Sequence, residues 1–410
     1  MIFPELRIAM ISAHSCPVGN LGAKDTGGMS VYIRELAREL GRQGHSVDIY
    51  TRIHNSADPQ VISIGERARL IHLQAGHEND IHKLALYYYL PEFTCNLENY
   101  RKDNSLQYDI VFSHYWLSGW VGKYLQQWWQ VPHVTMFHTV GAIKNSIGIG
   151  EDEPELRIVT ERESVNNCQR IIATTAAERE DLVRYYDALP EKIGIVPCGV
   201  NMEHFQPVDK VTARQKLGLS HDKILLFVGR IDPLKGVQQL LKAIPHLRTT
   251  TGLKLIVIGG DEDSVHDIEN LKKLASALNI RDAVTFLGLV KHEELPYFYS
   301  AADVCIVPSY YESFGLVALE SLACGTPVLA TDVGDLSNII RPGETGYILA
   351  DNNPESIADR IDMIFSGTSH DMESALSIKA SVSEYSWENI AGNIIQELRL
   401  ASGSELATVA

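Results

Sequence analysis

The feature of this sequence that most constrains its fold is the alternation of short, apolar, β-branched runs with longer segments of helical periodicity. Such alternation is typical of βαβ units, in which crossover helices join the strands of a parallel sheet. The segment 30–44 places Ile33, Leu36, Ala37 and Leu40 on one helical face, as a crossover helix would. The sequence therefore predicts an α/β protein. The expected strands are residues 7–12, 46–51, 109–113, 133–138, 170–174, 223–229, 253–259, 283–288, 303–308 and 327–331.

The strands fall into two series, which predict two domains. A chain of 410 residues is longer than one ordinary domain, and a Cys-Gly-Val-Asn turn separates the two series. We expect residues 1–203 to form a first Rossmann-like domain and residues 204–386 a second. A C-terminal helix at about 387–402 is expected to pack back on the first. Doubly wound sheets bind ligands at the carboxyl ends of their strands, so we expect the substrates in a cleft between the domains.

Charge and composition exclude several classes of function. The net charge of -16 argues against nucleic acid as a partner and against docking on an anionic membrane. No apolar stretch reaches the length of about 18 residues that a membrane span needs. The six cysteines are scattered, without the spacing of a zinc site. We therefore expect a cytoplasmic protein with no stable membrane association, no nucleic-acid partner and no bound metal.

The first candidate binding motif follows the strand expected at 223–229. Residues 228–236 read Val-Gly-Arg-Ile-Asp-Pro-Leu-Lys-Gly, so Arg230 and Lys235 lie on a strand-to-helix loop. Fixed guanidinium and ammonium groups stabilise the negative charge that collects on a departing nucleoside diphosphate. The motif predicts a diphosphate site that needs no metal, although two surface cations on a solvated loop would give the same pattern.

The second candidate motif follows the strand expected at 303–308. Residues 312–320 read Glu-Ser-Phe-Gly-Leu-Val-Ala-Leu-Glu. If a helix begins at residue 313 or 314, the amides of Phe314, Gly315 and Leu316 have no helical acceptor and suit a phosphate. Gly315 would also let the backbone approach a ligand closely. This motif therefore predicts a second contact to the same anion.

Two glutamates bound this second motif, and on one helix they cannot act as a pair. Eight positions place Glu320 about 80° round the helix from Glu312 and roughly 12 Å along its axis. A glycosidase-like carboxylate pair needs about 5–10 Å and convergent side chains. We expect separate roles, in which Glu320 accepts hydrogen bonds from ribose hydroxyls and Glu312 from the donor sugar. Two helix-surface glutamates are the alternative.

Together the two motifs resemble the donor signature of glycosyltransferase family 4, whose members have the GT-B fold of two Rossmann-like domains. The pattern is Gly-Arg-x-x-Pro-x-Lys-Gly followed by Pro-Ser-x-x-Glu-Ser-Phe-Gly-Leu-Val-Ala-x-Glu. The resemblance implies a retaining, metal-independent glycosyltransferase with a nucleotide sugar, expected to be a UDP-sugar, as co-substrate and no further cofactor. It also implies catalytic roles for Arg230, Lys235 and Glu312.

A glycine pair gives a first indication of the acceptor side. Gly27 and Gly28 lie between the first strand and its helix, where glycines permit a tight turn and a close ligand. A simple turn would look the same. In the family this loop touches the donor phosphate and the acceptor, so the resemblance implies a binding role for both glycines.

Three further segments resemble one subgroup of the family, the enzymes that begin mycothiol synthesis by adding N-acetylglucosamine to an inositol phosphate. These segments are residues 113–119, 137–145 and 186–193. The resemblance implies a homodimer and an acceptor-phosphate pocket. The residues implied for that pocket are Lys83, Tyr115, Thr139 and Arg157. Two cations, a phenol and a hydroxyl suit a monophosphate. Without the resemblance, surface cations and core aromatics would be the ordinary interpretation.

Two more positions bear on the reaction and on the identity of the acceptor. His138 matches a family position beside the reacting carbon, and we expect it to position or stabilise the donor rather than to abstract a proton. Ser30 stands where the subgroup has an asparagine that helps to read the inositol ring. Sucrose-phosphate synthases share the family signature and take fructose 6-phosphate. A phosphorylated acceptor is therefore expected, while inositol stays open.

Two other classes of function share part of this pattern. A dinucleotide-dependent oxidoreductase also alternates strands and helices, but no Gly-x-Gly-x-x-Gly follows any expected strand. A non-catalytic sugar-nucleotide-binding protein would keep the donor motifs and lose the acceptor-side groups, which are present here. Asp261, Glu262 and Asp263 imitate the Asp-x-Asp metal motif of the other glycosyltransferase fold. They follow a strand of the second domain, and we expect a loop there.

Overall fold

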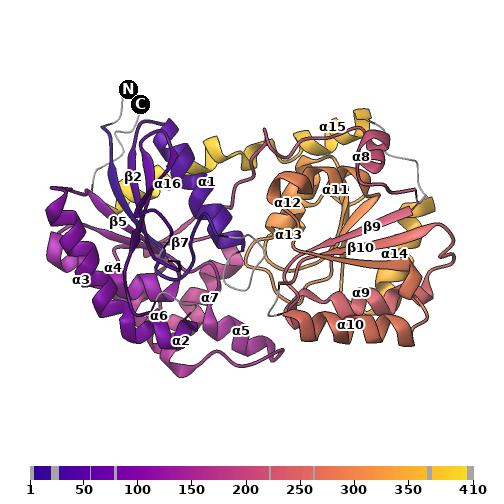
Figure 1. Ribbon diagram of the computed structural model, residues 1–410, viewed down its shortest axis with the longest axis horizontal. Helices are drawn as coiled ribbons and strands as arrows, with labels where there is room; N and C mark the ends of the chain where they lie inside the picture. The colour runs from indigo at the N-terminus through magenta and orange to yellow at the C-terminus, as the bar shows by residue number, and fades with distance from the viewer. Residues whose placement is uncertain are drawn as a thin grey trace. The chain divides into compact units, whose positions relative to one another are not determined.

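The computed structural model describes residues 4–19, 27–55, 57–77, 81–220, 223–261, 264–366 and 372–403 of the chain. Two compact units divide the chain. Of the described residues, the first contains 4–19, 28–197 and 387–403, and the second contains 27 and those within 198–386. Each unit is a mainly parallel sheet with helices on both faces (Figure 1). This arrangement confirms the predicted α/β architecture.

The sheet of the first unit has eight strands among the described residues, in the order β3-β4-β2-β1-β5-β6-β7-β8. All neighbours are parallel except β3 and β4, which pair as an antiparallel hairpin. Strand β5 is buried along its whole length, as expected where helices cover both faces. The strands are β1 (Arg7–Ile11), β2 (Ser46–Arg52), β3 (Val61–Gly65), β4 (Ala68–Leu73), β5 (Ile110–His114), β6 (His133–Met136), β7 (Arg170–Ala173) and β8 (Ile193–Ile195).

The helices of the first unit lie on both faces because right-handed crossovers run in opposite directions from the middle of the sheet. Helices α1 and α16 pack together, and α3, α4 and α6 form a second group (Figure 1). The four apolar side chains predicted for the inner face of the first crossover helix are all buried in α1. The helices are α1 (Gly28–Arg42), α2 (Lys83–Leu86), α3 (Leu90–Asp103), α4 (Tyr115–Trp129), α5 (Gly141–Ile147), α6 (Glu155–Asn167), α7 (Ala176–Tyr186) and α16 (Trp387–Ala401).

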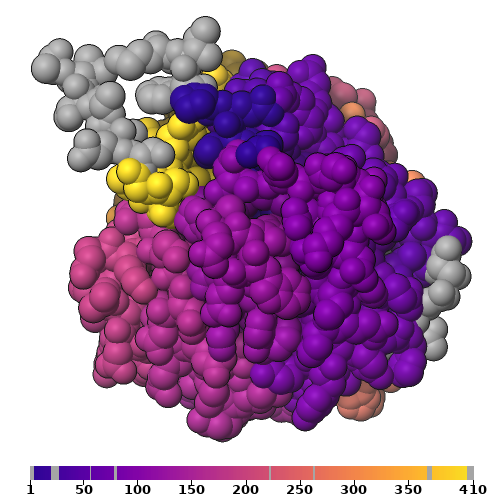
Figure 2. Space-filling model, turned by 90° about the vertical axis from the view of Figure 1, so that its left-hand side faces the viewer, coloured from indigo at the N-terminus to yellow at the C-terminus, as the bar shows by residue number. Residues whose placement is uncertain are grey.

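The C-terminal helix α16 is held to the first unit by polar contacts as well as by packing. The guanidinium of Arg399 donates to the carbonyl of Pro4 at 2.7 Å. The side-chain amide of Gln43 donates to the carbonyl of Glu388 at 3.1 Å. Figure 2 shows the last part of α16, in yellow, beside the first described residues of the chain, in indigo. The first and last described segments therefore belong to the same unit.

The sheet of the second unit has six parallel strands among the described residues, in the order β11-β10-β9-β12-β13-β14. Its strands are β9 (Lys223–Val228), β10 (Leu253–Ile258), β11 (Val284–Gly288), β12 (Val304–Val307), β13 (Val328–Thr331) and β14 (Gly346–Leu349). Helices α9, α10 and α14 pack together, and α11 packs with α8 and α12. The helices are α8 (Lys210–Lys216), α9 (Val237–Ala243), α10 (Val265–Ala277), α11 (Leu295–Ala301), α12 (Leu316–Ala323), α13 (Leu336–Ile339), α14 (Pro354–Ser366) and α15 (Met372–Ala380).

Some strands differ from the prediction. The hairpin of β3 and β4 and the edge strands β8 and β14 are not among the ten expected strands. The hairpin turns at Arg67, a non-glycine residue with a left-handed φ of 53°, which no Asn-Gly or Asp-Gly dipeptide signals in the sequence. The strand expected to run to His138 ends at Met136, because His138 has a left-handed φ of 60°.

Each sheet has one point at which the strand order reverses. This switch point lies between β1 and β5 in the first unit and between β9 and β12 in the second. The loops that leave the carboxyl ends of two such strands turn to opposite faces of the sheet and leave room for a ligand. Most of the predicted site residues lie on the loops after these four strands or after the adjacent strand β6.

Candidate active site

The two predicted donor motifs meet at the switch point of the second sheet. Strands β9 and β12 are neighbours, so the loops that follow them touch. The amide of Tyr310 donates to the carbonyl of Leu234 at 2.8 Å. Gly236 has a φ of +70°, and a Cβ at that position would lie 1.9 Å from the carbonyl oxygen of Pro308. Only glycine therefore allows this close approach of the two loops.

The contact between the loops pairs a cation of the first motif with a carboxylate of the second. The ammonium of Lys235 donates to Oε1 of Glu312 at 2.7 Å, and the hydroxyl of Ser309 donates to the same oxygen at 2.8 Å. The side chains of Lys235 and Glu312 are 20% and 14% exposed. Arg230 lies on the same loop as Lys235 but is 45% exposed, with its guanidinium 3.8 Å from the carboxylate of Asp232. The site thus combines one half-buried, paired cation with one cation that faces solvent.

The expected start of the helix in the second motif is wrong. Helix α12 begins at Leu316, after Gly315, which has a φ of 120° that only glycine adopts without strain. The first amides of this helix are therefore those of Leu316 and Val317. Phe314 is buried. Because Glu312 precedes the helix, the expected helical angle and distance between the two glutamates do not apply.

Glu320 lies on α12 and is buried, which excludes the interpretation of a helix-surface glutamate. The hydroxyl of Tyr299 donates to its Oε2 at 2.7 Å, and Nε2 of His292 lies 4.0 Å from its Oε1. Burial raises the pKa of Glu320 to about 7, and the hydrogen bond from Tyr299 opposes that rise. A carboxylate that is part ionised near neutral pH, with one oxygen not bonded to Tyr299, can accept hydrogen bonds from a ligand's hydroxyl groups.

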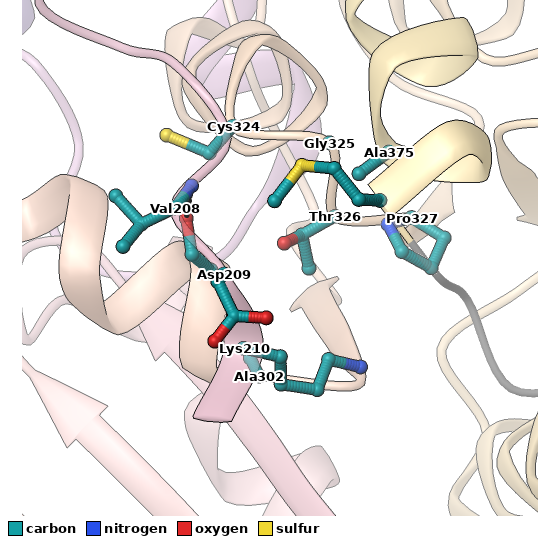
Figure 3. A pocket seen from close by; sticks show the side chains of 11 residues that line it. Val208, Asp209, Lys210, Ala302, Cys324, Gly325, Thr326, Pro327 and Ala375 are labelled. Atoms are coloured by element: carbon teal, nitrogen blue, oxygen red, sulfur yellow. Dashed lines mark hydrogen bonds between the residues drawn. The ribbon is translucent and has the colours of Figure 1, made fainter. Parts of the chain in front are cut away.

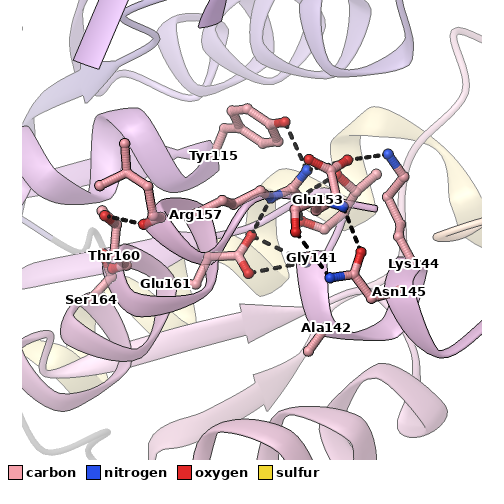
Figure 4. A network of polar contacts seen from close by, with 12 residues as sticks. Tyr115, Gly141, Ala142, Lys144, Asn145, Glu153, Arg157, Thr160, Glu161 and Ser164 are labelled. Atoms are coloured by element: carbon pink, nitrogen blue, oxygen red, sulfur yellow. Dashed lines mark hydrogen bonds and ion pairs between the residues drawn. The ribbon is translucent and has the colours of Figure 1, made fainter. Parts of the chain in front are cut away.

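In the first unit, three of the four predicted acceptor-pocket residues come together around a buried arginine. Figure 4 shows two of them, Arg157 and Tyr115. Arg157 is 1% exposed. Its Nη1 donates to the hydroxyl of Tyr115 at 3.0 Å, and its Nη2 donates to the carbonyl and the hydroxyl of Thr139 at 2.7 and 3.0 Å. Its Nε donates to Glu161 at 2.7 Å, a carboxylate that is also 1% exposed. Arg157 is therefore a fixed, buried cation rather than a surface cation.

Two of the predicted site residues occupy strained backbone positions. Tyr115 and His138 have left-handed φ values of 76° and 60°. They follow β5 and β6, which pair as parallel neighbours. A bulky residue in this region costs of order 1–3 kcal/mol, and such residues gather at functional sites. The aromatic ring of Tyr115 also stacks on His14 with the ring centroids 4.5 Å apart.

His138 is joined to a second histidine. Nδ1 of His114 lies 2.9 Å from Nε2 of His138, and burial lowers the pKa of both rings, so both are neutral at neutral pH. One nitrogen must donate and the other accept. Nε2 of His114 is buried without a hydrogen-bond partner among the described residues. Since a buried N–H without an acceptor is rare, the favoured arrangement protonates His114 on Nδ1. His138 then accepts at Nε2 and carries its proton on Nδ1.

The positions of Lys83, Ser30 and Gly27 give less direct support for their predicted binding roles. Lys83 begins helix α2 and is half-buried, and its positive charge helps to lower the pKa of His14, after burial. Ser30 is fully buried in α1, where its hydroxyl hydrogen-bonds that of Ser15 at 2.6 Å. Acceptor binding by Ser30 would have to share or break that bond. At Gly27 an added Cβ would meet nothing within 4 Å, so packing alone does not require glycine there.

Sequence reasoning missed several residues of this site. Glu153 and Glu161 stand four residues before and after Arg157, and both pair with it. The i, i+4 spacing of opposite charges was an available signal for these pairs. The position of His114 at the end of a strand next to that of His138 was a weaker signal, because the bond depends on the positive φ of His138.

A cavity of about 80 Å³ lies elsewhere in the second unit (Figure 3). Its lining includes Val208, Lys210, Ser300 and Cys324. Pockets for small ligands usually measure about 300–1,000 Å³. None of the predicted site residues lines this cavity, so it is not the donor site.

Among the described residues, no group of three or more His, Cys, Asp or Glu side chains could hold a metal ion. None of the helices that the structure describes combines the length and apolar character needed to span a bilayer. Glu262 and Asp263, of the motif that imitates a metal site, lie outside the described residues, as do residues 20–26 before the glycine pair.

Comparison with known proteins identifies relatives of both units. Residues 26–204 match the family model described as Glycosyltransferase Family 4, and residues 209–380 match the one described as Glycosyl transferases group 1. The D-inositol 3-phosphate glycosyltransferase of Corynebacterium glutamicum is 37% identical over 365 residues, which cover 87% of each chain. That of Streptomyces scabiei is 40% identical over 86% of this chain and 81% of the relative.

The similarity extends to solved structures. Sucrose-phosphate synthase from Thermosynechococcus elongatus has a TM-score of 0.89 at 33% identity, over 98% of this chain and 100% of the other. HepE of Anabaena, solved with UDP and glucose, has a TM-score of 0.76 at 16% identity, over 97% of this chain and 100% of the other, and so shares the fold. These matches span both units and include both switch points. The chain therefore belongs to glycosyltransferase family 4 and is a glycosyltransferase of the GT-B fold.

Proposed function

We propose that the protein transfers a hexosyl or N-acetylhexosaminyl group from a UDP-sugar to a small phosphorylated polyol such as an inositol phosphate. The proposed transfer retains the anomeric configuration and needs no metal. The observation that carries the acceptor part of the proposal is the buried guanidinium of Arg157 beside the hydroxyls of Tyr115 and Thr139. A charged donor flanked by two hydroxyls suits a phosphate monoester. The names of the relatives in Corynebacterium and Streptomyces support an inositol phosphate as acceptor.

On the donor side, the proposed roles follow from charge and exposure. Breaking the bond between the sugar and the nucleotide collects negative charge on the leaving diphosphate, and Arg230 and Lys235 would stabilise that charge. The exposed guanidinium of Arg230 can reach a ligand without losing a close partner. Lys235 can share its ammonium between Glu312 and a phosphate. Glu320 would accept hydrogen bonds from the ribose. The leaving diphosphate would then take the proton of the attacking hydroxyl on the same face of the sugar.

His138 fits a role in positioning the donor. With its proton on Nδ1 and its Nε2 bonded to His114, it can offer an N–H to a sugar hydroxyl. Its lowered pKa makes it a weak base. The arrangement therefore supports hydrogen-bond donation by His138 over proton abstraction.

A second acceptor is favoured by the similarity to sucrose-phosphate synthase at 33% identity. Fructose 6-phosphate also presents a phosphate monoester, so the cluster around Arg157 suits it equally. The two candidate acceptors, inositol phosphate and fructose 6-phosphate, differ in the ring to which the phosphate is attached.

The test compares phosphorylated acceptors with the same acceptors lacking phosphate. UDP release is measured from UDP-glucose and UDP-N-acetylglucosamine with D-inositol 3-phosphate, inositol, fructose 6-phosphate and fructose. We expect turnover with one phosphorylated acceptor and at least a tenfold lower kcat/KM without the phosphate. The anomeric configuration of the product is read by NMR. Equal turnover of inositol and its phosphate, or of fructose and its phosphate, would refute the proposed acceptor class.

A pair of lysine variants tests the pocket itself. Lys83→Met should raise the KM for the phosphorylated acceptor and leave that for the UDP-sugar unchanged. Lys102→Met, on α3 of the same unit, removes a lysine that is 66% exposed and serves as the matched control. If both variants change the acceptor KM equally, Lys83 has no specific part in the pocket.

A further inference from the structure

The carboxylate of Glu153 lies between two cations of the first unit (Figure 4). It pairs with Nη1 of Arg157 at 2.8 Å and with the ammonium of Lys144. The side chain of Asn145 binds the backbone of Glu153 on both sides, accepting from its amide at 2.6 Å and donating to its carbonyl at 3.0 Å. A carboxylate held by an arginine and a lysine is a bound anion that the chain supplies itself.

Arg157 has no N–H to spare for a further anion. A guanidinium has five N–H donors. Its Nε binds Glu161, and its Nη2 binds both the carbonyl and the hydroxyl of Thr139. Its Nη1 serves the hydroxyl of Tyr115 and the carboxylate of Glu153. A phosphate can therefore reach Arg157 only by displacing one of these partners.

Glu161 is the partner least able to leave. It is 1% exposed and accepts hydrogen bonds from the amide of Gly141 and from the hydroxyl of Tyr186 as well as from Arg157. Removing it would leave three buried donors without an acceptor, at a cost of about 1–3 kcal/mol or more for each. Glu161 thus fixes the guanidinium in place.

Glu153 is the partner most able to leave. Its side chain is 18% exposed, and it follows a stretch that includes the exposed residues Gly150, Glu151 and Asp152. Displacing its carboxylate into solvent would release Nη1 of Arg157 and the ammonium of Lys144 together. These two groups then form an open anion site beside the hydroxyl of Tyr115.

We propose that the carboxylate of Glu153 occupies, in the unliganded protein, the place of the acceptor's phosphate, and that Lys144 is a second cation that binds this phosphate with Arg157. This inference rests on the proposed function. A phosphate monoester carries a charge of about −1.5 to −2 near pH 7 and offers three acceptor oxygens. It can replace the single charge of Glu153 and accept from Arg157, Lys144 and Tyr115 at once. The pocket would then select phosphorylated acceptors by competition with an internal anion.

Inorganic phosphate is the probe that tests the site without a need to know the acceptor. Its affinity for the full chain is measured by calorimetry for the wild type, Glu153→Gln and Lys144→Met. Glu153→Gln keeps the size of the side chain but removes the competing charge. Glu153→Ser is a second variant, whose side chain is too short to contact Arg157 and Lys144. We expect both Glu153 variants to bind phosphate roughly ten- to hundredfold more tightly and Lys144→Met to bind it more weakly by a similar factor.

A second ion pair of the same unit provides the matched control. Lys123 on α4 donates to Glu163 on α6 at 3.1 Å. Glu163→Gln also releases a lysine, yet it should leave phosphate affinity unchanged, since no second cation is described beside Lys123. Unchanged or weaker phosphate binding in Glu153→Gln and Glu153→Ser, with the wild-type circular dichroism spectrum, would overturn the inference. An unchanged affinity in Lys144→Met would overturn the role of Lys144.

The outcomes separate this inference from the proposed function. If the Glu153 variants do not gain affinity while phosphorylated acceptors are still preferred to their unphosphorylated forms, the inference fails and the proposed function stands. If the variants gain affinity for phosphate but no phosphorylated acceptor is used, the anion site stands and the proposed acceptor class fails.

Discussion

Replacing Glu320 with glutamine should stabilise the second unit and weaken the donor site at the same time. Burial raises the pKa of Glu320 from 4.5 to about 7. A difference of about 2.5 pKa units corresponds to roughly 3 kcal/mol. Below about pH 4.5 the carboxyl is protonated in both the folded and the unfolded chain. As the pH rises to about 7, the unfolded chain loses this proton while the folded chain keeps it, so the free energy of unfolding falls by that amount.

Glu320→Gln lacks this pH-dependent loss because its side chain is neutral throughout. Its advantage in the free energy of unfolding over the wild type should therefore grow by roughly 3 kcal/mol between about pH 4.5 and pH 8. For a domain of 150–250 residues, 1 kcal/mol shifts Tm by about 2–4 °C, so the difference in Tm should grow by roughly 6–12 °C. Glu373→Gln, which changes an exposed glutamate of the same unit, is the matched control.

The assay must distinguish the two units. All five tryptophans of the chain lie outside residues 198–386, so tryptophan fluorescence follows the first unit and should be unaffected by the substitution. Circular dichroism follows the unfolding of both units. An unfolding transition that circular dichroism detects and tryptophan fluorescence does not therefore belongs to the second unit. If the Tm of this transition changes with pH in parallel for the wild type and Glu320→Gln, Glu320 is not the titrating group and the reasoning fails.

The donor side of this prediction has its own measurement. An ionised carboxylate that accepts from ribose is worth roughly ten- to hundredfold in affinity. Glu320→Gln should therefore bind UDP more weakly by that factor at about pH 8 in calorimetry. The wild type should lose affinity for UDP as the pH falls below about 7, where Glu320 becomes protonated. Greater stability with unchanged UDP affinity would show that Glu320 does not bind the ribose.

Five substitutions, at four residues, give three further tests of the catalytic assignment. Arg230→Ala and Lys235→Ala should each lower kcat by about 100- to 1,000-fold with little change in the acceptor's KM, because the cations act on the leaving diphosphate. Unchanged turnover in both variants would refute this role. His114→Ala should lower kcat and shift the ¹⁵N signals of His138 toward a mixture of tautomers. His114→Asn can still donate a hydrogen bond to His138 and should retain more activity. If kcat falls while the signals of His138 stay unchanged, His114 does not position His138. Glu312→Gln should bind UDP more tightly, because it releases the ammonium of Lys235, and its kcat should be lower. Weaker UDP binding would mean instead that Glu312 holds Lys235 in place for the ligand.

Much of the fold could be predicted from the sequence because the strands are short, buried and β-branched. Strand β5, for example, is buried along its whole length and reads as a continuous apolar run as far as Phe112. Strand β3 escaped prediction because it pairs only with β4, at the edge of the sheet, and alternates exposed residues with half-buried or buried ones. Its hairpin turns at Arg67, where nothing in the sequence indicates a left-handed residue.

The candidate site was predictable where a motif stays local and not where it depends on packing. Arg230 and Lys235 follow a strand in the sequence and in the structure. The start of α12 could not be predicted, because Gly315 adopts its φ of 120° where a Cβ would lie 2.6 Å from Leu336, a contact across 21 residues of sequence. The burial of Arg157 could not be predicted from helical periodicity either, because it depends on contacts of α6 with Tyr115, directly after β5, and with Thr139, after β6.

The two candidate phosphate sites share one electrostatic arrangement. Lys235 is paired with Glu312 in the second unit, and Lys144 and Arg157 are paired with Glu153 in the first. A part-buried cation with no partner would cost several kcal/mol in the unliganded protein, and a chain with a net charge of -16 has carboxylates at hand to avoid that cost. A carboxylate carries one charge, while a phosphate monoester carries nearly two. On the proposed assignments, an internal carboxylate stabilises each empty site in a different way. Glu153 would give way to the more highly charged phosphate monoester, whereas Glu312 would stay and share Lys235 with the diphosphate, whose negative charge grows as the bond to the sugar breaks.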